Sequence, residues 1–216
     1  MRAMLSLATE LGDAAFLLPA SAVVACVLFL TRSRRAALVW ASAIGLCGGL
    51  TILAKLAFHA CGADLPGLGI RSPSGHTSLS ATFYSCVALT IAVDKPWPAR
   101  LGLGLLTAAV LAAIAESRVW TGAHTPPEVA AGLLLGACCI LWYALAAQPN
   151  AVPALAWPLP LVLLVALGVG MHGQHFSLEG RIAHLADRLS LSQLVCPAVP
   201  EEATVGSRDR ASLPES

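Results

Sequence analysis

Two short segments of the sequence hold most of the side chains that could do chemistry. The first contains the ionisable residues Lys55, His59, Asp64 and Arg71 and ends in the run Pro73-Ser74-Gly75-His76. The second reads Ser117, Arg118, five residues, His124, three residues and Glu128. Histidines, cations and a carboxylate suit phosphoryl transfer, which needs a fixed cradle of donors, an attacking group and an acid for the departing oxygen.

Each of these roles has a candidate side chain. Neutral His124 could attack phosphorus if a carboxylate such as Glu128 holds its other ring nitrogen. Protonated His76 could supply the proton of the leaving group. The guanidinium of Arg118 matches phosphate with a planar fork, and Ser74 and Gly75 would begin a helix whose backbone N–H groups point at an anion.

The two motifs, in this order and each at the head of an apolar run, resemble the second and third motifs of the type 2 phosphatidic acid phosphatase family, the lipid phosphate phosphatases. The resemblance covers about residues 50 to 130 by motif. It implies that His124 forms a phosphohistidine, that Glu128 orients it and that His76 protonates the leaving group. It also implies phosphate binding by Ser74, Gly75 and Arg118, with no metal or other cofactor.

The sequence departs from the family pattern at two places. The family usually has Asp where this chain has Glu128, which is one methylene longer and must fold back to reach the same imidazole nitrogen. The first family motif, lysine followed after six residues by Arg-Pro, is not intact, because Gly62 stands seven positions after Lys55. Lys55 still ends an apolar run where the motif lysine would lie, and Arg71 is a candidate substitute for the missing arginine.

Structural interpretations of the same residues remain open from the sequence. The run from Pro73 to His76 could simply start a helix, with Ser74 as its N-cap. Thr125 to Glu128 has the form of a capping box, so Glu128 could close a helix instead of, or in addition to, orienting His124. Lys55 and Arg118 could be interfacial side chains that mark the ends of membrane spans.

The composition places these motifs in a membrane protein. Of 216 residues, 57% are hydrophobic and 12% are charged, whereas a soluble domain carries about 25% charged residues. The net charge of +1 gives no global field that would attract nucleic acid. Five of the seven cysteines lie in apolar runs and no Cys-x-x-Cys or Cys/His ligand spacing occurs, which argues against a metal site. Cys61 and Cys196 remain candidates for a disulfide.

The spacing of charges predicts an all-α, multi-pass membrane bundle, because a charge at a helix centre costs about 2.5 to 3.5 kcal/mol on the insertion scale. Six charge-free runs lie near the length of about 20 residues that crosses the hydrocarbon layer. The fourth has only 15 residues, so its ends must carry polar groups into the membrane. The six predicted spans are Ala14–Thr31, Ala36–Ala54, Ser72–Val93, Leu101–Ala115, Val129–Ala147 and Ala151–Met171.

After the last run the composition becomes polar. Leu178, Ile182, Leu185 and Leu189 recur at helical spacing, which predicts a short amphipathic helix. The expected domains are therefore a six-span phosphatase domain over residues 1–173, an amphipathic tail helix over 174–197 and a disordered tail over 198–216. The loops expected to carry no motif hold five basic residues, which predicts that they are cytoplasmic and that the motifs and both termini are extracytoplasmic.

The leading hypothesis is an integral membrane phosphoric ester hydrolase, or an acid anhydride hydrolase if its substrate is a diphosphate. Its expected partners are the bilayer and a phosphorylated membrane lipid whose chain stays in hydrocarbon while the headgroup reaches the site. Two alternatives remain open. The same site could pass the phosphoryl group to a lipid acceptor, or the chain could be a non-catalytic protein that binds phosphorylated lipids.

Overall fold

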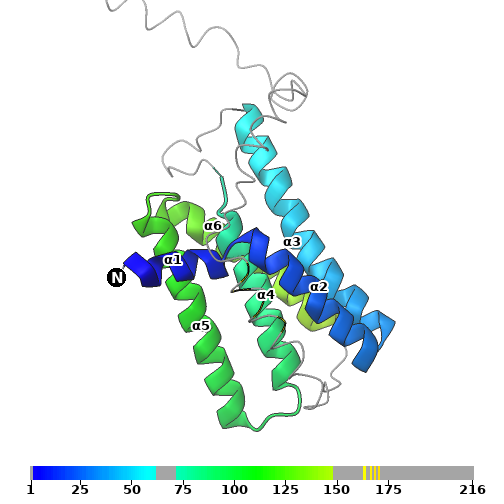
Figure 1. Ribbon diagram of the computed structural model, residues 1–216. Coiled ribbons are helices and arrows are strands. Elements are labelled where there is room, and N and C mark those ends of the chain that lie inside the picture. The colour runs from blue at the N-terminus through cyan, green and yellow to red at the C-terminus, as the bar shows by residue number, and fades with distance from the viewer. Residues whose placement is uncertain are drawn as a thin grey trace, which may run out of the picture.

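The computed structural model describes residues 2–61, 72–147 and the four positions 163, 166, 168 and 170. This part of the chain is all-helical and contains no strand, which confirms the all-α part of the predicted fold class. After the first helix, which lies across the others, the helices alternate in direction through the bundle (Figure 1). They are α1 (Arg2–Leu11), α2 (Ala14–Thr31), α3 (Arg34–Cys61), α4 (Gly75–Ala92), α5 (Trp97–Trp120) and α6 (Pro126–Ala146).

Four described helices are long and apolar enough to cross a membrane. They are α2, the Arg34–Phe58 part of α3, α5 and α6. Helix α4 coincides with the third predicted span but is not among the four. Of the sixth predicted span only positions 163, 166, 168 and 170 are described. The amphipathic tail helix and the tail after residue 197 lie outside the described residues, so the six-span bundle stays a prediction.

Helix α5 is longer than its charge-free run. The run of 15 residues is embedded in a helix of 24 residues that continues through Arg118 to Trp120. At 1.5 Å per residue this helix is about 36 Å long, which exceeds the hydrocarbon thickness of about 30 Å. Charged side chains near a span end can extend to the interface, so they mark the edge of the membrane without ending the helix.

The apolar core lies among α2, α3, α4 and α6 and centres on Trp40. This side chain is almost fully buried, and its indole N–H donates to the carbonyl of Ser21 at 3.0 Å. The rings of Phe83 and Tyr143 meet it edge-on, with centroids 5.7 and 6.0 Å away. Because the indole N–H has an acceptor, burying Trp40 leaves no polar atom of this side chain without a hydrogen bond.

Helix α4 occupies the middle of the bundle (Figure 1). It buries many hydroxyl groups. Most of these hydroxyls donate to backbone carbonyls of the preceding turn, as Thr82 does to Ser78 at 2.9 Å and Thr90 to Cys86 at 2.7 Å. The Ser78 hydroxyl also meets that of Thr51 on α3 at 3.0 Å. A helix that is only moderately apolar is therefore buried without stranding its hydroxyls.

Helix α1, which the charge-free runs did not predict, lies across α5 at one end of the bundle (Figure 1). The Thr9 hydroxyl donates to the Ser117 hydroxyl at 3.2 Å, and Tyr84 on α4 donates to the carbonyl of Leu11 at 2.8 Å. The amino-terminal segment is thus fixed to the two helices that carry His76 and Arg118.

Candidate active site

The candidate site lies where four helix ends meet. The C-terminal ends of α3 and α5 and the N-terminal ends of α4 and α6 share one end of the bundle, the end that α1 crosses (Figure 1). Both sequence motifs are therefore brought together by alternating helix direction. Helix N-termini also direct free backbone N–H groups and a partial positive charge toward this region.

The starts of α4 and α6 touch through their backbones. The Ser74 N–H donates to the Glu128 carbonyl at 3.0 Å. Thr77 donates to the Ser74 carbonyl at 3.0 Å. Gly132 permits this approach, because a methyl group there would lie 2.5 Å from the Ser74 carbonyl oxygen. The contact joins the motif that contains Ser74 to the motif that contains Glu128, which are more than fifty residues apart in the sequence.

The carboxylate of Glu128 accepts from three N–H groups. Its Oε2 atom accepts from Nδ1 of His124 at 2.9 Å and from the Thr125 backbone at 3.0 Å. Its Oε1 atom accepts from the Ser72 backbone at 3.2 Å. The two interpretations left open by the sequence therefore hold together, since Glu128 closes the first turn of α6 and also contacts the imidazole. The longer side chain of Glu128 folds back toward the start of α6, and it reaches the imidazole because His124 lies just before that helix.

His124 is held in a defined orientation. It is 8% exposed and Glu128 is 5% exposed, so water competes little for their contact. With Nδ1–H directed at the carboxylate, the neutral ring keeps its lone pair on Nε2. That nitrogen can serve as a nucleophile, and the carboxylate can balance the positive charge that forms on the ring when it attacks.

A tight turn places His124 close to Arg118. Gly122 adopts a left-handed conformation with φ of 68°. The backbone N–H groups of Ala123 and His124 both donate to the Arg118 carbonyl, at 3.1 and 3.2 Å. Arg118 occupies the last turn of α5, so this turn connects the end of one helix directly to the start of the next.

Lys55 and Ser74 adjoin the start of α4. Lys55 is buried near the end of α3, and a methyl group added at Gly75 would lie 3.7 Å from its Cε atom. The Ser74 side chain is fully buried, and within the described part of the chain its hydroxyl has no hydrogen-bond partner. A buried polar atom without a partner requires an explanation, and a ligand at this position would provide one.

His76 lies one residue into α4 and its side chain is 22% exposed. Its Nε2 atom is 3.6 Å from Oδ2 of Asp13, a buried residue that neither motif contains. Sequence reasoning missed Asp13 as a site residue. An aspartate directly before an apolar run is typical of an N-cap, but nothing local in the sequence indicates a contact with His76.

Two predictions rest on residues or side chains that the structure does not describe. Arg71 is one of them, so its role as a substitute for the motif arginine stays a prediction. The side chains of Cys61 and Cys196 are likewise not described, and their disulfide remains untested. Among the residues that the structure does describe, no group of three His, Cys, Asp or Glu side chains could hold a metal ion.

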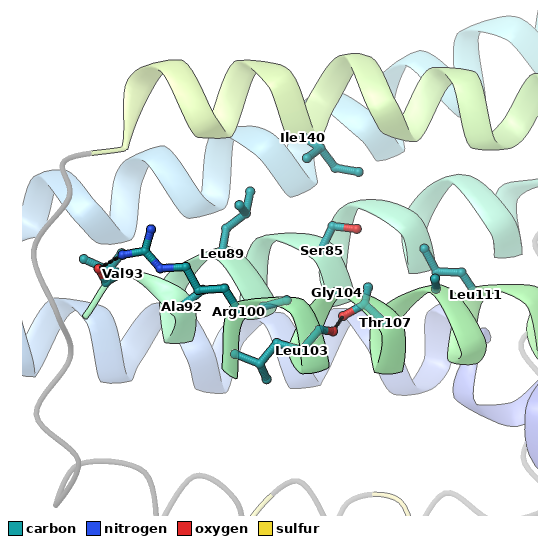
Figure 2. Close-up of a pocket in the computed structure, with 12 residues that line it drawn as sticks. Ser85, Leu89, Ala92, Val93, Arg100, Leu103, Gly104, Thr107, Leu111 and Ile140 are labelled. Carbon is teal, nitrogen blue, oxygen red and sulfur yellow. Dashed lines mark hydrogen bonds between the residues drawn. The ribbon is translucent and has the colours of Figure 1, made fainter. Parts of the chain in front are cut away.

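A groove of about 700 Å³ runs along α4 and α5, from the middle of the bundle to the end opposite His76. Figure 2 shows its apolar walls, with Leu89, Leu103 and Leu111 on the two helices and Ile140 contributed by α6. Arg100 closes the far end and donates to the carbonyls of Val93 and Lys95, at 3.1 and 2.7 Å.

Comparison with known proteins agrees with the motifs. Residues 55–151, which include every described candidate site residue predicted from the sequence, match the PAP2 superfamily. The chain is also similar to an uncharacterised 22.5 kDa protein in the cps region of Klebsiella pneumoniae, with 37% identity over 133 residues. That alignment covers 58% of this chain and 61% of the Klebsiella protein. No solved structure matches the chain.

Proposed function

We propose that this chain hydrolyses a lipid phosphate or lipid diphosphate in the membrane. The match of residues 55–151 to the PAP2 superfamily supports a phosphatase function in general. The reaction proceeds without a metal, through a phosphohistidine at His124. The observation that carries the proposal is the buried contact of 2.9 Å between His124 and Glu128, directly beside the start of α4.

In the proposed first step, Nε2 of His124 attacks phosphorus. The bond from phosphorus to the leaving oxygen breaks, and His76 gives that oxygen its proton. Nδ1 of His124 keeps its proton, which stays hydrogen-bonded to Glu128, and the carboxylate balances the positive charge of the ring. In the second step a water molecule loses a proton to His76 and attacks the phosphohistidine, which releases inorganic phosphate and restores neutral His124.

The phosphate oxygens would be held by donors around the helix ends. Ser74 supplies a buried hydroxyl without another partner in the described region, and Gly75 lets the chain approach closely. Lys55 and Arg118 supply positive charge, and we extend the same role to Arg71. Such donors stabilise the charge that spreads over the phosphoryl oxygens in the transition state.

Two observations favour a lipid over a soluble phosphate ester. Four described helices are long and apolar enough to span a membrane, so the site lies at an end of such helices, at the level of lipid headgroups. The apolar groove between α4 and α5 offers space for a hydrocarbon chain along the same helix that carries His76. A headgroup at the helix ends and a chain against α4 would keep each part of the substrate in its preferred solvent.

We place the site on the extracytoplasmic face. Five basic residues lie at the opposite end of the bundle, in the two connections or in the first turns of the helices that follow them: Arg32, Arg34, Arg35, Lys95 and Arg100. Positive residues near span ends favour the cytoplasmic side. Alkaline phosphatase fused after Gly122 should therefore be active in cells, whereas a fusion after Asp94 should be inactive. The reverse pattern would overturn the orientation.

Trapping the covalent intermediate tests the proposed reaction. The full chain in detergent, mixed with a 32P-labelled lipid phosphate and quenched in alkali, should retain label with the acid-labile, alkali-stable behaviour of phosphohistidine. His124→Ala should lose both the label and phosphate release, and His172→Ala, a histidine outside both motifs, should retain them. Phosphate release with the same rate in His124→Ala would refute the mechanism.

The same experiment separates the alternatives. Label that passes to a lipid acceptor, with no free phosphate, would identify a phosphoryl transferase. Saturable binding of the labelled lipid by wild type and His124→Ala, with neither label transfer nor turnover, would identify a non-catalytic binder. We favour the hydrolase because the pair of His124 and Glu128 has the geometry of an activated nucleophile, which lipid binding alone would not require.

A further inference from the structure

We propose that Asp13 is a positioning residue for His76, so that the site holds two histidine–carboxylate pairs of opposite ring orientation. This inference rests on the proposed function. Asp13 is 4% exposed, and its Oδ2 atom lies 3.6 Å from Nε2 of His76. The distance is that of an ion pair and is longer than a direct hydrogen bond.

The two carboxylate oxygens of Asp13 have separate partners. Oδ1 accepts from the backbone N–H of Ala15 at 2.8 Å and caps α2. Oδ2 faces His76. Because the cap fixes the carboxylate at the start of a helix, its second oxygen is presented to the imidazole without further loss of side-chain freedom.

The backbone next to Asp13 packs directly on the His76 ring. A methyl group at Gly12 would lie 3.5 Å from Cδ2 of His76 and 2.8 Å from Cγ2 of Ile114. Tyr84 holds the preceding carbonyl, that of Leu11, at 2.8 Å. The segment that carries Asp13 is therefore anchored to α4, which carries His76, and to α5.

The arrangement assigns different nitrogens to the two histidines. His124 turns Nδ1 to its carboxylate and leaves Nε2 for attack on phosphorus. His76 turns Nε2 to its carboxylate and leaves Nδ1 for the leaving oxygen. A general acid must carry its proton as a positively charged ring, and the buried carboxylate of Asp13 balances that charge while it fixes the ring.

Asp13→Asn separates this role from helix capping. Asparagine is as good an N-cap as aspartate, so α2 should form normally, but the amide lacks the negative charge. Asp94→Asn is the matched control, because Asp94 is an exposed aspartate near the opposite end of the bundle. Asp13→Ser, which also caps, is a second variant if the asparagine protein is unstable in detergent.

The readout is the dependence on the leaving group. An alkyl leaving group, as in phosphatidate, needs a proton, whereas p-nitrophenolate departs without one. General acid catalysis is worth roughly 100- to 10,000-fold, and a mispositioned acid should lose part of it. We expect Asp13→Asn to lower kcat/KM, which reports the first step alone, by about 10- to 100-fold on phosphatidate and by less than about 3-fold on p-nitrophenyl phosphate. Asp94→Asn should change neither.

A second measurement uses His76→Ala as background. If Asp13 acts through His76, adding Asp13→Asn to His76→Ala should cause no further loss on phosphatidate. Equal losses on both substrates, or additive losses in the double variant, would overturn the positioning role and leave the proposed function intact. Absence of phosphate release by the wild-type protein from either substrate would overturn the proposed function and this inference with it.

Discussion

Replacing Glu128 by Gln probes the contact on which the proposed mechanism depends. The carboxylate accepts three N–H bonds, two at Oε2 and one at Oε1. Gln has a single acceptor oxygen, and its NH₂ group can only donate. The orientation that keeps two bonds places the amide oxygen toward His124 and Thr125 and the NH₂ group toward the Ser72 N–H. We therefore expect the His124 tautomer to survive.

Glu128→Gln should therefore remove mainly the negative charge that stabilises the positive His124 ring in the transition state. A hydrogen bond to a charged group contributes about 1.5 to 3 kcal/mol, and two unit charges about 4 Å apart near a protein surface interact by about 4 kcal/mol. The attacking imidazole becomes positive, so about 1.5 to 4 kcal/mol of transition-state stabilisation is removed. At 1.36 kcal/mol per tenfold change, Glu128→Gln should lower kcat by roughly 10- to 1,000-fold.

Single-turnover phosphate release measures the loss of rate, and thermal unfolding of the same preparation shows whether the variant is still folded. Glu128→Asp is the matched control, because it keeps the charge and shortens the side chain by one methylene. It should retain more activity than Glu128→Gln, while its unfolding temperature falls because one carboxylate cannot reach both Ser72 and His124. A kcat for Glu128→Gln equal to that of wild type would refute the reasoning, as would Glu128→Asp being the less active of the two.

Three further predictions follow from the described contacts. Ser74→Ala should leave the unfolding temperature unchanged or higher, because the buried hydroxyl has no partner in the described structure, but should weaken inhibition by inorganic phosphate by about 10-fold or more; unchanged inhibition would exclude Ser74 from the anion site. Gly132→Ala should destabilise the protein by about 1 to 3 kcal/mol and lower phosphate release, since its methyl would meet the Ser74 carbonyl, whereas Gly45→Ala, with nothing within 4 Å, should do neither. Phosphate release should be the same after dialysis against a chelator, and recovery only on addition of a divalent metal would contradict the metal-free mechanism.

Much of the helical framework could be predicted because charge is expensive in hydrocarbon. The first predicted span, Ala14–Thr31, has the bounds of α2, and the next four predicted spans overlap α3 to α6. Helix ends were harder to predict. Helix α5 continues past its charge-free run because interfacial charges do not break a helix, and α1 was missed because its apolar residues occupy only part of its surface.

The site was predictable wherever its chemistry is local in sequence. His124 and Glu128 are four residues apart around a helix start, so their contact could be anticipated from spacing alone. The pairing of Asp13 with His76 could not, because it depends on how α1 and α2 fold back over α4. The sequence also presented capping and orientation as alternatives for Glu128, whereas its two oxygens allow both.

The hydroxyl content of α4 bears on how the chain is made. Helix α4 packs chiefly against α6, which is synthesised after it. During translation the ribosome therefore delivers α4, which is not among the four helices long and apolar enough to cross a membrane, before its main neighbour exists. The threonine and serine hydroxyls that donate to carbonyls of the preceding turn lower the cost of holding α4 in the membrane before α6 is made. Helix α3, already in place, offers Thr51 as a first contact. Assembly of the candidate site must wait until α6, the helix that carries Glu128, has been synthesised.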